Sequence, residues 1–119
     1  MQMKRIFVAA LAACALFVLP RIAFAHAHLL SSTPAANATV HGPDVAFELR
    51  FNSRVDGRHS VLTLVTADGR TEPLAVANQS AESNLNAHAT LKPGSYTLRW
   101  QALATDGHIT RGEIPFTVR

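Results

Sequence analysis

Residues 45–51 alternate apolar and polar side chains with a period of two, and no other feature restricts the possible folds of this chain as strongly. Val45, Phe47, Leu49 and Phe51 would lie on one face of an extended strand, because successive side chains of a β-strand point to opposite faces. The charged residues between them would lie on the other face. The stretch therefore predicts a β-strand with one buried and one solvated face.

Strand patterns also dominate the rest of the chain beyond residue 25. Further strands are predicted at residues 61–66, 71–77, 84–91, 95–103 and 114–118. Pro73 places its strand at a sheet edge, because proline cannot donate to the hydrogen-bond ladder. No stretch sustains a helical period with caps, so we expect little helix. Short strands separated by turn sequences, such as those at Gly69 and Gly94, predict a single all-β domain, an antiparallel β-sandwich.

Residues 1–25 have the composition of a secretory signal peptide. Lys4 and Arg5 precede an apolar run at residues 6–19, and Ala23-Phe24-Ala25 has the small-x-small pattern of a cleavage site. The run is shorter than the roughly 20 residues that a membrane-spanning helix needs. Cleavage after Ala25 would leave a domain at residues 26–119 and would predict a periplasmic location.

Two other fates of the N-terminal segment remain possible from the sequence. It could be retained as a membrane anchor. Leu11-Ala12-Ala13-Cys14 also resembles a lipoprotein processing box, although cleavage there would leave the apolar residues 15–19 and the second cleavage motif unexplained.

Removal of residues 1–25 would change the chemistry of the chain. Three of the 11 Lys and Arg residues (Lys4, Arg5 and Arg21) lie in this segment, whereas all 8 Asp and Glu residues lie beyond it, so the remainder is formally neutral. A neutral domain argues against nucleic-acid binding, which requires a basic face. The segment also holds every Met and Cys of the chain, so the remainder has no sulfur ligand and no possible disulfide.

His26 would become the N-terminal residue after cleavage. Its neutral α-amine and its imidazole Nδ1 can close a six-membered chelate on one metal ion. Asp106 and His108 form a second candidate group for metal binding, because residues i and i+2 of an extended chain share a face. Gly107 between them would let the backbone approach the site closely. Three nitrogens and one carboxylate oxygen suit tetragonal Cu(II) better than tetrahedral zinc, and the lack of sulfur argues against tight Cu(I) binding.

Each of these motifs also has a plain structural explanation. A histidine after a cleavage site can occur by chance, and Asp106-Gly107-His108 can be a turn in which the carboxylate accepts backbone N–H bonds. Spacing alone does not place residue 26 near residue 108.

The chain resembles the CopC family of periplasmic copper-binding proteins over essentially all of residues 26–119. The matching motifs are His26-Ala27-His28-Leu29, Ser32-Thr33-Pro34-Ala35, Phe51-Asn52-Ser53, Leu91-Lys92-Pro93-Gly94-Ser95-Tyr96-Thr97-Leu98-Arg99-Trp100, Asp106-Gly107-His108, Gly112-Glu113 and Phe116-Thr117-Val118. The resemblance implies a Greek-key β-sandwich or barrel of immunoglobulin-like or cupredoxin-like type. It also implies one Cu(II) per chain, bound by the amine and imidazole of His26, by His108 and by Asp106. A CopD-type inner-membrane copper permease is the implied partner.

The chain departs from the family pattern in two places. Some family members bind Cu(I) at a methionine-rich loop, which residues 26–119 lack. Some also have a glutamate two residues after the phenylalanine that is Phe51 here, and this chain has Ser53 at that position. We therefore expect no Cu(I) site, and a further carboxylate ligand is in doubt.

The remaining histidines and aromatic residues have mostly structural interpretations. His28 can complete an amine–amide–amide–imidazole chelate of the N-terminal tripeptide, a mode that folding of residues 26–28 onto a sheet would block. His41 and His59 are expected in solvated loops and His88 on a strand, whereas Tyr96 and Trp100 are expected in the core.

The sequence thus predicts a non-enzymatic periplasmic Cu(II) carrier or buffer. Two alternatives stay open. Oxidative polysaccharide-cleaving enzymes also bind copper through the amine and imidazole of an N-terminal histidine, an arrangement called a histidine brace. These enzymes need a wide aromatic face for their substrate, and this chain has one Trp and one Tyr. A metal-free immunoglobulin-like interaction module is the other alternative.

Overall fold

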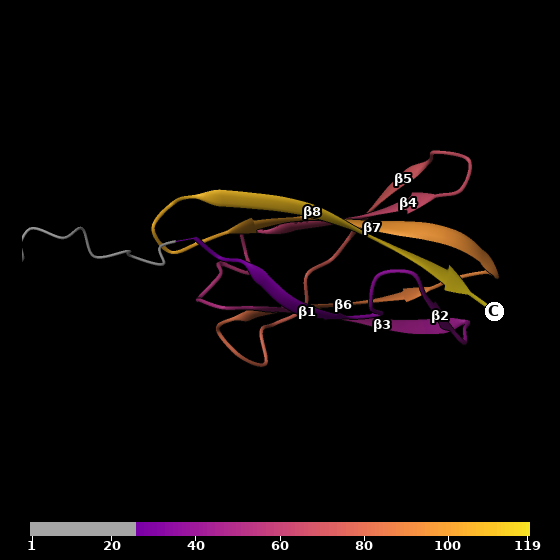
Figure 1. The fold of residues 1–119 in the computed structure, drawn as a ribbon, viewed down its shortest axis with the longest axis horizontal. Helices are drawn as coiled ribbons and strands as arrows, with labels where there is room; N and C mark the ends of the chain where they lie inside the picture. The colour runs from indigo at the N-terminus through magenta and orange to yellow at the C-terminus, as the bar shows by residue number, and fades with distance from the viewer. Residues whose placement is uncertain (1–25) are drawn as a thin grey trace, which may run out of the picture.

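A computed structural model of the chain describes residues 26–119 as two β-sheets packed face to face (Figure 1). The strands are β1 (Leu29–Thr33), β2 (Ala38–Val40), β3 (Asp44–Phe51), β4 (Val61–Thr66), β5 (Thr71–Leu74), β6 (Asn84–Thr90), β7 (Gly94–Leu103) and β8 (Ile109–Val118). This part of the chain contains no helix, and so none that could span a membrane. The predicted signal peptide, residues 1–25, lies outside the described residues.

The strands form a three-stranded sheet in the order β1-β3-β6 and a five-stranded sheet in the order β2-β8-β7-β4-β5. The chain changes sheet between β1 and β2, β2 and β3, β3 and β4, β5 and β6, and β6 and β7. These crossovers give the Greek-key, immunoglobulin-like sandwich, and the predicted all-β fold class is confirmed. All strand pairs are antiparallel except β2 and β8, which pair in parallel.

The core follows the period-two pattern of the sequence. Alternate residues of β3 are buried from Val45 to Phe51, as the alternation predicts. From the facing sheet, Trp100 packs edge-on against Phe51 with ring centroids 5.3 Å apart, and Phe116 packs against Phe47 at 5.5 Å. Full burial of an aromatic or large aliphatic side chain stabilises the fold by about 1.5–3 kcal/mol, so these alternating faces hold the sheets together.

The strand boundaries differ from the sequence prediction where the alternation is weak. β1 is an edge strand with a bulge at Leu30, β2 has three residues, and the first half of β8 has no large buried side chain. None of these segments carries the apolar alternation on which the prediction depended. β5 ends at Leu74 rather than at residue 77, and its predicted position at a sheet edge is confirmed.

One end of the sandwich brings together two segments that are far apart in the sequence. In Figure 1 the start of β1, in indigo, lies beside the turn between β7 and β8, in yellow. The hydroxyl of Thr110 at the start of β8 donates a hydrogen bond of 2.8 Å to the carbonyl of Ala27. The segment before β1 and the β7–β8 turn are therefore held together although they are far apart in sequence.

Gly112 has a packing role that yields a test of this arrangement. A Cβ at this position would lie 2.5 Å from two ring atoms of Trp100, which is buried. We expect Gly112→Ala to lower the free energy of unfolding by about 1–3 kcal/mol, because overpacking forces core side chains and backbone to shift. Urea unfolding followed by tryptophan fluorescence measures the change.

The matched control is Glu113→Ala on the next residue of β8. Glu113 forms an exposed ion pair with Arg99 at 3.2 Å, and exposed pairs contribute about 0–1 kcal/mol. Equal losses in the two variants would contradict the packing role of Gly112.

Candidate metal centre

His26, Asp106 and His108 converge at this end of the sandwich. Each of the three residues offers one ligand atom, and these atoms all lie within 4.8 Å of one another. The rings of His26 and His108 meet edge to face, with centroids 4.4 Å apart and an interplanar angle of 84°. The fold thus places together the three side chains that the sequence singled out, and their function as metal ligands remains a prediction.

Asp106 and His108 are positioned by a turn rather than by an extended strand. The backbone N–H of Ala104 donates to the carbonyl of His108 at 2.8 Å, and that of Gly107 donates to Ala104 at 3.0 Å. The expectation that an i, i+2 strand spacing aligns the two side chains was therefore wrong about the backbone. The turn, which was the plain structural alternative, aligns them instead.

Gly107 supplies the backbone conformation that this turn requires. Its φ is +88°, a region that residues with a Cβ rarely adopt, and nothing lies within 4 Å of the place where a Cβ would be. Close approach of the backbone, the other reason that the sequence suggested for this glycine, stays a prediction. Glycine at this position lets the chain reverse between Asp106 and His108.

The carboxylate of Asp106 holds His108 at two points. Oδ1 accepts the backbone N–H of His108 at 3.1 Å, and Oδ2 lies 2.9 Å from Nδ1 of the ring. The backbone hydrogen bond, together with the ring contact, lowers the pKa of Asp106 against the opposing effect of partial burial. When Nδ1 donates to the carboxylate, Nε2 of His108 keeps the lone pair that a metal requires.

Ala27 and His28 are fixed by contacts with both sheets. Ala27 is fully buried in the core, and its carbonyl accepts the Thr110 hydrogen bond. The N–H of His28 donates to Oδ1 of Asn52 at 2.7 Å, and the N–H of Asn52 donates to the carbonyl of His28 at 3.0 Å. His26 is thereby directed toward the β7–β8 turn.

The other histidines lie outside the three-residue group. The exposed ring of His28 is 6.4 Å from that of His26, and His41 and His88 are exposed. His59 forms a 2.8 Å contact between Nδ1 and Oδ2 of Asp56, a pair that sequence reasoning missed. The Asp-x-x-His spacing was its only sequence signal.

Ser53 does not belong to the group either. Its Oγ is buried without a hydrogen-bond partner. The structure therefore gives no indication that this position supplies a further ligand.

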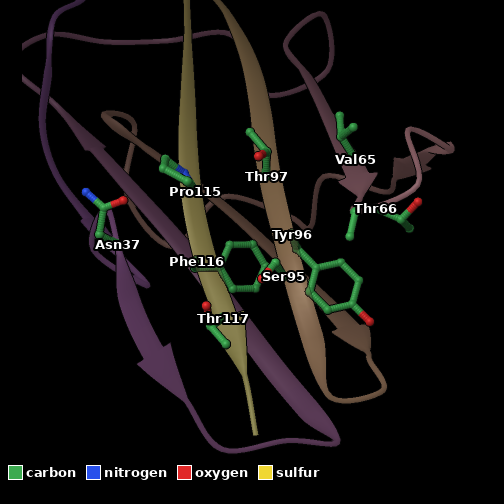
Figure 2. Close-up of a pocket in the computed structure, with 10 residues that line it drawn as sticks. Asn37, Val65, Thr66, Ser95, Tyr96, Thr97, Pro115, Phe116 and Thr117 are labelled. Carbon is green, nitrogen blue, oxygen red and sulfur yellow. The ribbon is translucent and has the colours of Figure 1, made fainter.

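A surface hollow elsewhere on the five-stranded sheet has a different composition (Figure 2). Its lining residues are uncharged: Asn37, Val65, Thr66, Ala67, Ser95, Tyr96, Thr97, Pro115, Phe116 and Thr117. Thr117 lies roughly 30 Å from His108 along β8, at about 3.4 Å per residue. The hollow offers no imidazole, carboxylate or thiolate to a metal and is separate from the candidate centre.

The chain is similar to proteins of known sequence and structure. The CopC domain family model matches residues 29–119. Protein YobA of Escherichia coli (strain K12) is 34% identical over 100 residues, which cover 81% of each chain.

Two solved structures share the fold over most of the chain. CopC from Methylosinus trichosporium OB3b has a TM-score of 0.72 at 27% identity and covers 78% of this chain and 93% of its own. PcoC, a methionine-rich copper resistance protein from Escherichia coli, has a TM-score of 0.69 at 27% identity. The match covers 80% of this chain and 100% of the PcoC chain.

The geometry of the turn yields a prediction about Gly107. Gly107→Ala should lower the free energy of unfolding by about 1–2 kcal/mol, because the alanine Cβ disfavours a positive φ and no neighbour compensates. Gly107→Asn should lower the free energy of unfolding by less, since asparagine tolerates a positive φ better than alanine does. Urea unfolding of the metal-free protein measures both variants. Equal stability of the alanine variant and the wild type would contradict the assigned backbone role.

Proposed function

The chain belongs to the CopC family, and on this premise we propose that it is a periplasmic protein that carries or buffers copper, binding one Cu(II) per chain. The observation that carries the proposal is the convergence of His26, Asp106 and His108 within 4.8 Å. In the proposed mature protein, cleavage after Ala25 adds the α-amine of His26 to this group. The ligand set is then three nitrogens and one carboxylate oxygen.

The donor chemistry of residues 26–119 supports Cu(II) as the cargo. This part of the chain has no Met or Cys, and imidazole, amine and carboxylate are donors that suit Cu(II) better than Cu(I). The turn holds His108 and Asp106 in place through hydrogen bonds between them, and the burial of Ala27 limits the freedom of His26. Prior positioning of this kind lowers the entropic cost of binding.

The surroundings of the group favour a carrier over an oxidative enzyme. The side chain of His108 is 61% exposed, so the ion would be reachable by a receiving protein. The single Trp of the chain is buried in the core, and the single Tyr stacks on Phe116 beside the distant hollow. Neither aromatic residue provides a stacking surface for a polysaccharide beside His26. Transfer to a CopD-type permease of the inner membrane is part of the proposal.

The decisive test compares Cu(II) binding by a chain that begins at His26 with binding by the same chain carrying one additional glycine before His26. We expect one Cu(II) per chain in the first protein and at least tenfold weaker binding in the second, about 1.4 kcal/mol or more, because the added residue removes the histidine amine. Competition with a chelator of known affinity provides the measurement. The intact mass of periplasmic protein establishes whether the natural chain begins at His26.

Two substitutions serve as matched controls for this test. His108→Ala should weaken binding at least about tenfold, whereas His28→Ala should have a much smaller effect. The reverse ranking would indicate that Cu(II) binds to the N-terminal tripeptide and would refute the proposed centre. Equal affinity of the extended and unextended chains would refute the role of the amine.

Copper binding should weaken steeply between about pH 7.5 and pH 5. Amines and imidazoles bind metal only when deprotonated, so protons compete with the metal for these ligands as the pH falls. The lowered pKa of Asp106 keeps its carboxylate ionised, since that charge is lost only below the ordinary range near pH 4. The copper-linked rise in melting temperature should fade in parallel. An affinity that does not change over this range would exclude these nitrogen ligands.

A further inference from the structure

The N-terminal tripeptide could bind Cu(II) in a second way that competes with the proposed centre. In that local chelate, the amine of His26, the backbone nitrogens of Ala27 and His28, and the imidazole of His28 would surround the ion. Each backbone nitrogen would first have to release its proton to solvent. Both modes use the same amine, so one chain cannot form both around one ion.

In the fold, the backbone nitrogen of His28 is already engaged as a donor. Its N–H donates to Oδ1 of Asn52 at 2.7 Å, and the N–H of Asn52 donates back to the carbonyl of His28 at 3.0 Å. Asn52 directly follows β3 and thus holds His28 from the end of a core strand. This pair of hydrogen bonds, the Asn52 clamp, holds the His28 backbone in place and directs its N–H at Asn52.

A second contact restrains the preceding residue. Ala27 is fully buried, and its carbonyl accepts the hydroxyl of Thr110 at 2.8 Å. A rearrangement of the tripeptide around an ion would be opposed by the burial of Ala27 and by this hydrogen bond. The exposed ring of His28 lies 6.4 Å from that of His26, and the ring of His108 is closer, at 4.4 Å.

We propose that Asn52 is a specificity-determining residue that closes the local chelate and thereby directs Cu(II) to His26, Asp106 and His108. Asn52 acts as a positioning residue through the backbone of His28. The inference rests on the proposed function, because it requires the free amine of His26. In this inference, the side chain of Asn52 selects between the two modes of copper binding although it is a ligand in neither.

The test uses the chain beginning at His26 and the substitution Asn52→Ala, which removes the acceptor for the His28 N–H. Asn52 is exposed and its backbone hydrogen bond to His28 does not depend on the side chain, so we expect the variant to fold. Asn52→Asp keeps an oxygen in the same place and is the matched control. Thr110→Val and Thr110→Ser form a parallel pair that removes or retains the hydroxyl.

Visible absorption and electron paramagnetic resonance of one equivalent of Cu(II) distinguish the two modes. Deprotonated amides are stronger-field ligands than imidazole or carboxylate, so the local chelate absorbs at higher energy. We expect this shift in Asn52→Ala but not in Asn52→Asp. In the Asn52→Ala background, His28→Ala should restore the wild-type spectrum, and His108→Ala should no longer cause the roughly tenfold loss of affinity expected in the wild type.

Hydrogen exchange of the His28 amide provides a readout on the metal-free protein. Loss of its acceptor should speed exchange in Asn52→Ala by roughly tenfold, the scale of one hydrogen bond, while Asn52→Asp retains protection. Unchanged exchange in the alanine variant would overturn the clamp. Faster exchange with a wild-type copper spectrum would overturn its role in specificity.

These outcomes separate the clamp from the proposed function. If the wild-type chain binds no Cu(II), the proposed function fails, and His28 exchange still decides whether the clamp exists. If the wild type already gives the spectrum of the local chelate, and His28→Ala abolishes it, the specificity role of Asn52 is overturned.

Discussion

The burial of Ala27 in the core is the contact on which the candidate metal centre depends. Fixing the backbone of one residue costs about 1–2 kcal/mol of conformational entropy. Here a fully buried methyl group and the hydrogen bond to Thr110 offset that cost. Ala27 separates His26 from His28, so its burial fixes the backbone on both sides.

The opposite half of the centre is rigid for a different reason. β7 and β8 pair from Gly94 opposite Val118 to Leu103 opposite Ile109, and this long ladder supports the short turn that carries Asp106 and His108. Within the turn, the carboxylate bonds both the backbone and the ring of His108. The Asp56–His59 pair has a similar carboxylate–imidazole contact but no third ligand beside it among the described residues. The proposed centre therefore differs from an ordinary Asp–His contact because His26 lies beside it.

Much of the fold could be predicted from the sequence, because residues 45–51 and 95–103 alternate with the two-residue period of a strand. β1, β2 and the first half of β8 were missed because they bury little apolar surface and are held by pairing with stronger neighbours. The motifs also identified the residues of the candidate centre. The strand spacing from which the alignment of Asp106 and His108 was predicted was wrong. The two side chains are aligned by a turn with a positive φ at Gly107, and the spacing of the residues does not specify that turn.

The sequence by itself determined the all-β fold class, the chemical character of the ligands and the absence of sulfur donors beyond residue 25, since these follow from residue identity and local periodicity. Only the tertiary structure decided that His26 meets His108 and that Asn52 holds His28. These residues are separated by 82 and 24 positions, taking the difference of the residue numbers. No local propensity acts over such separations. The contacts arise because β1 pairs with β3 in one sheet while β8 lies in the other, and packing the two sheets brings their ends together.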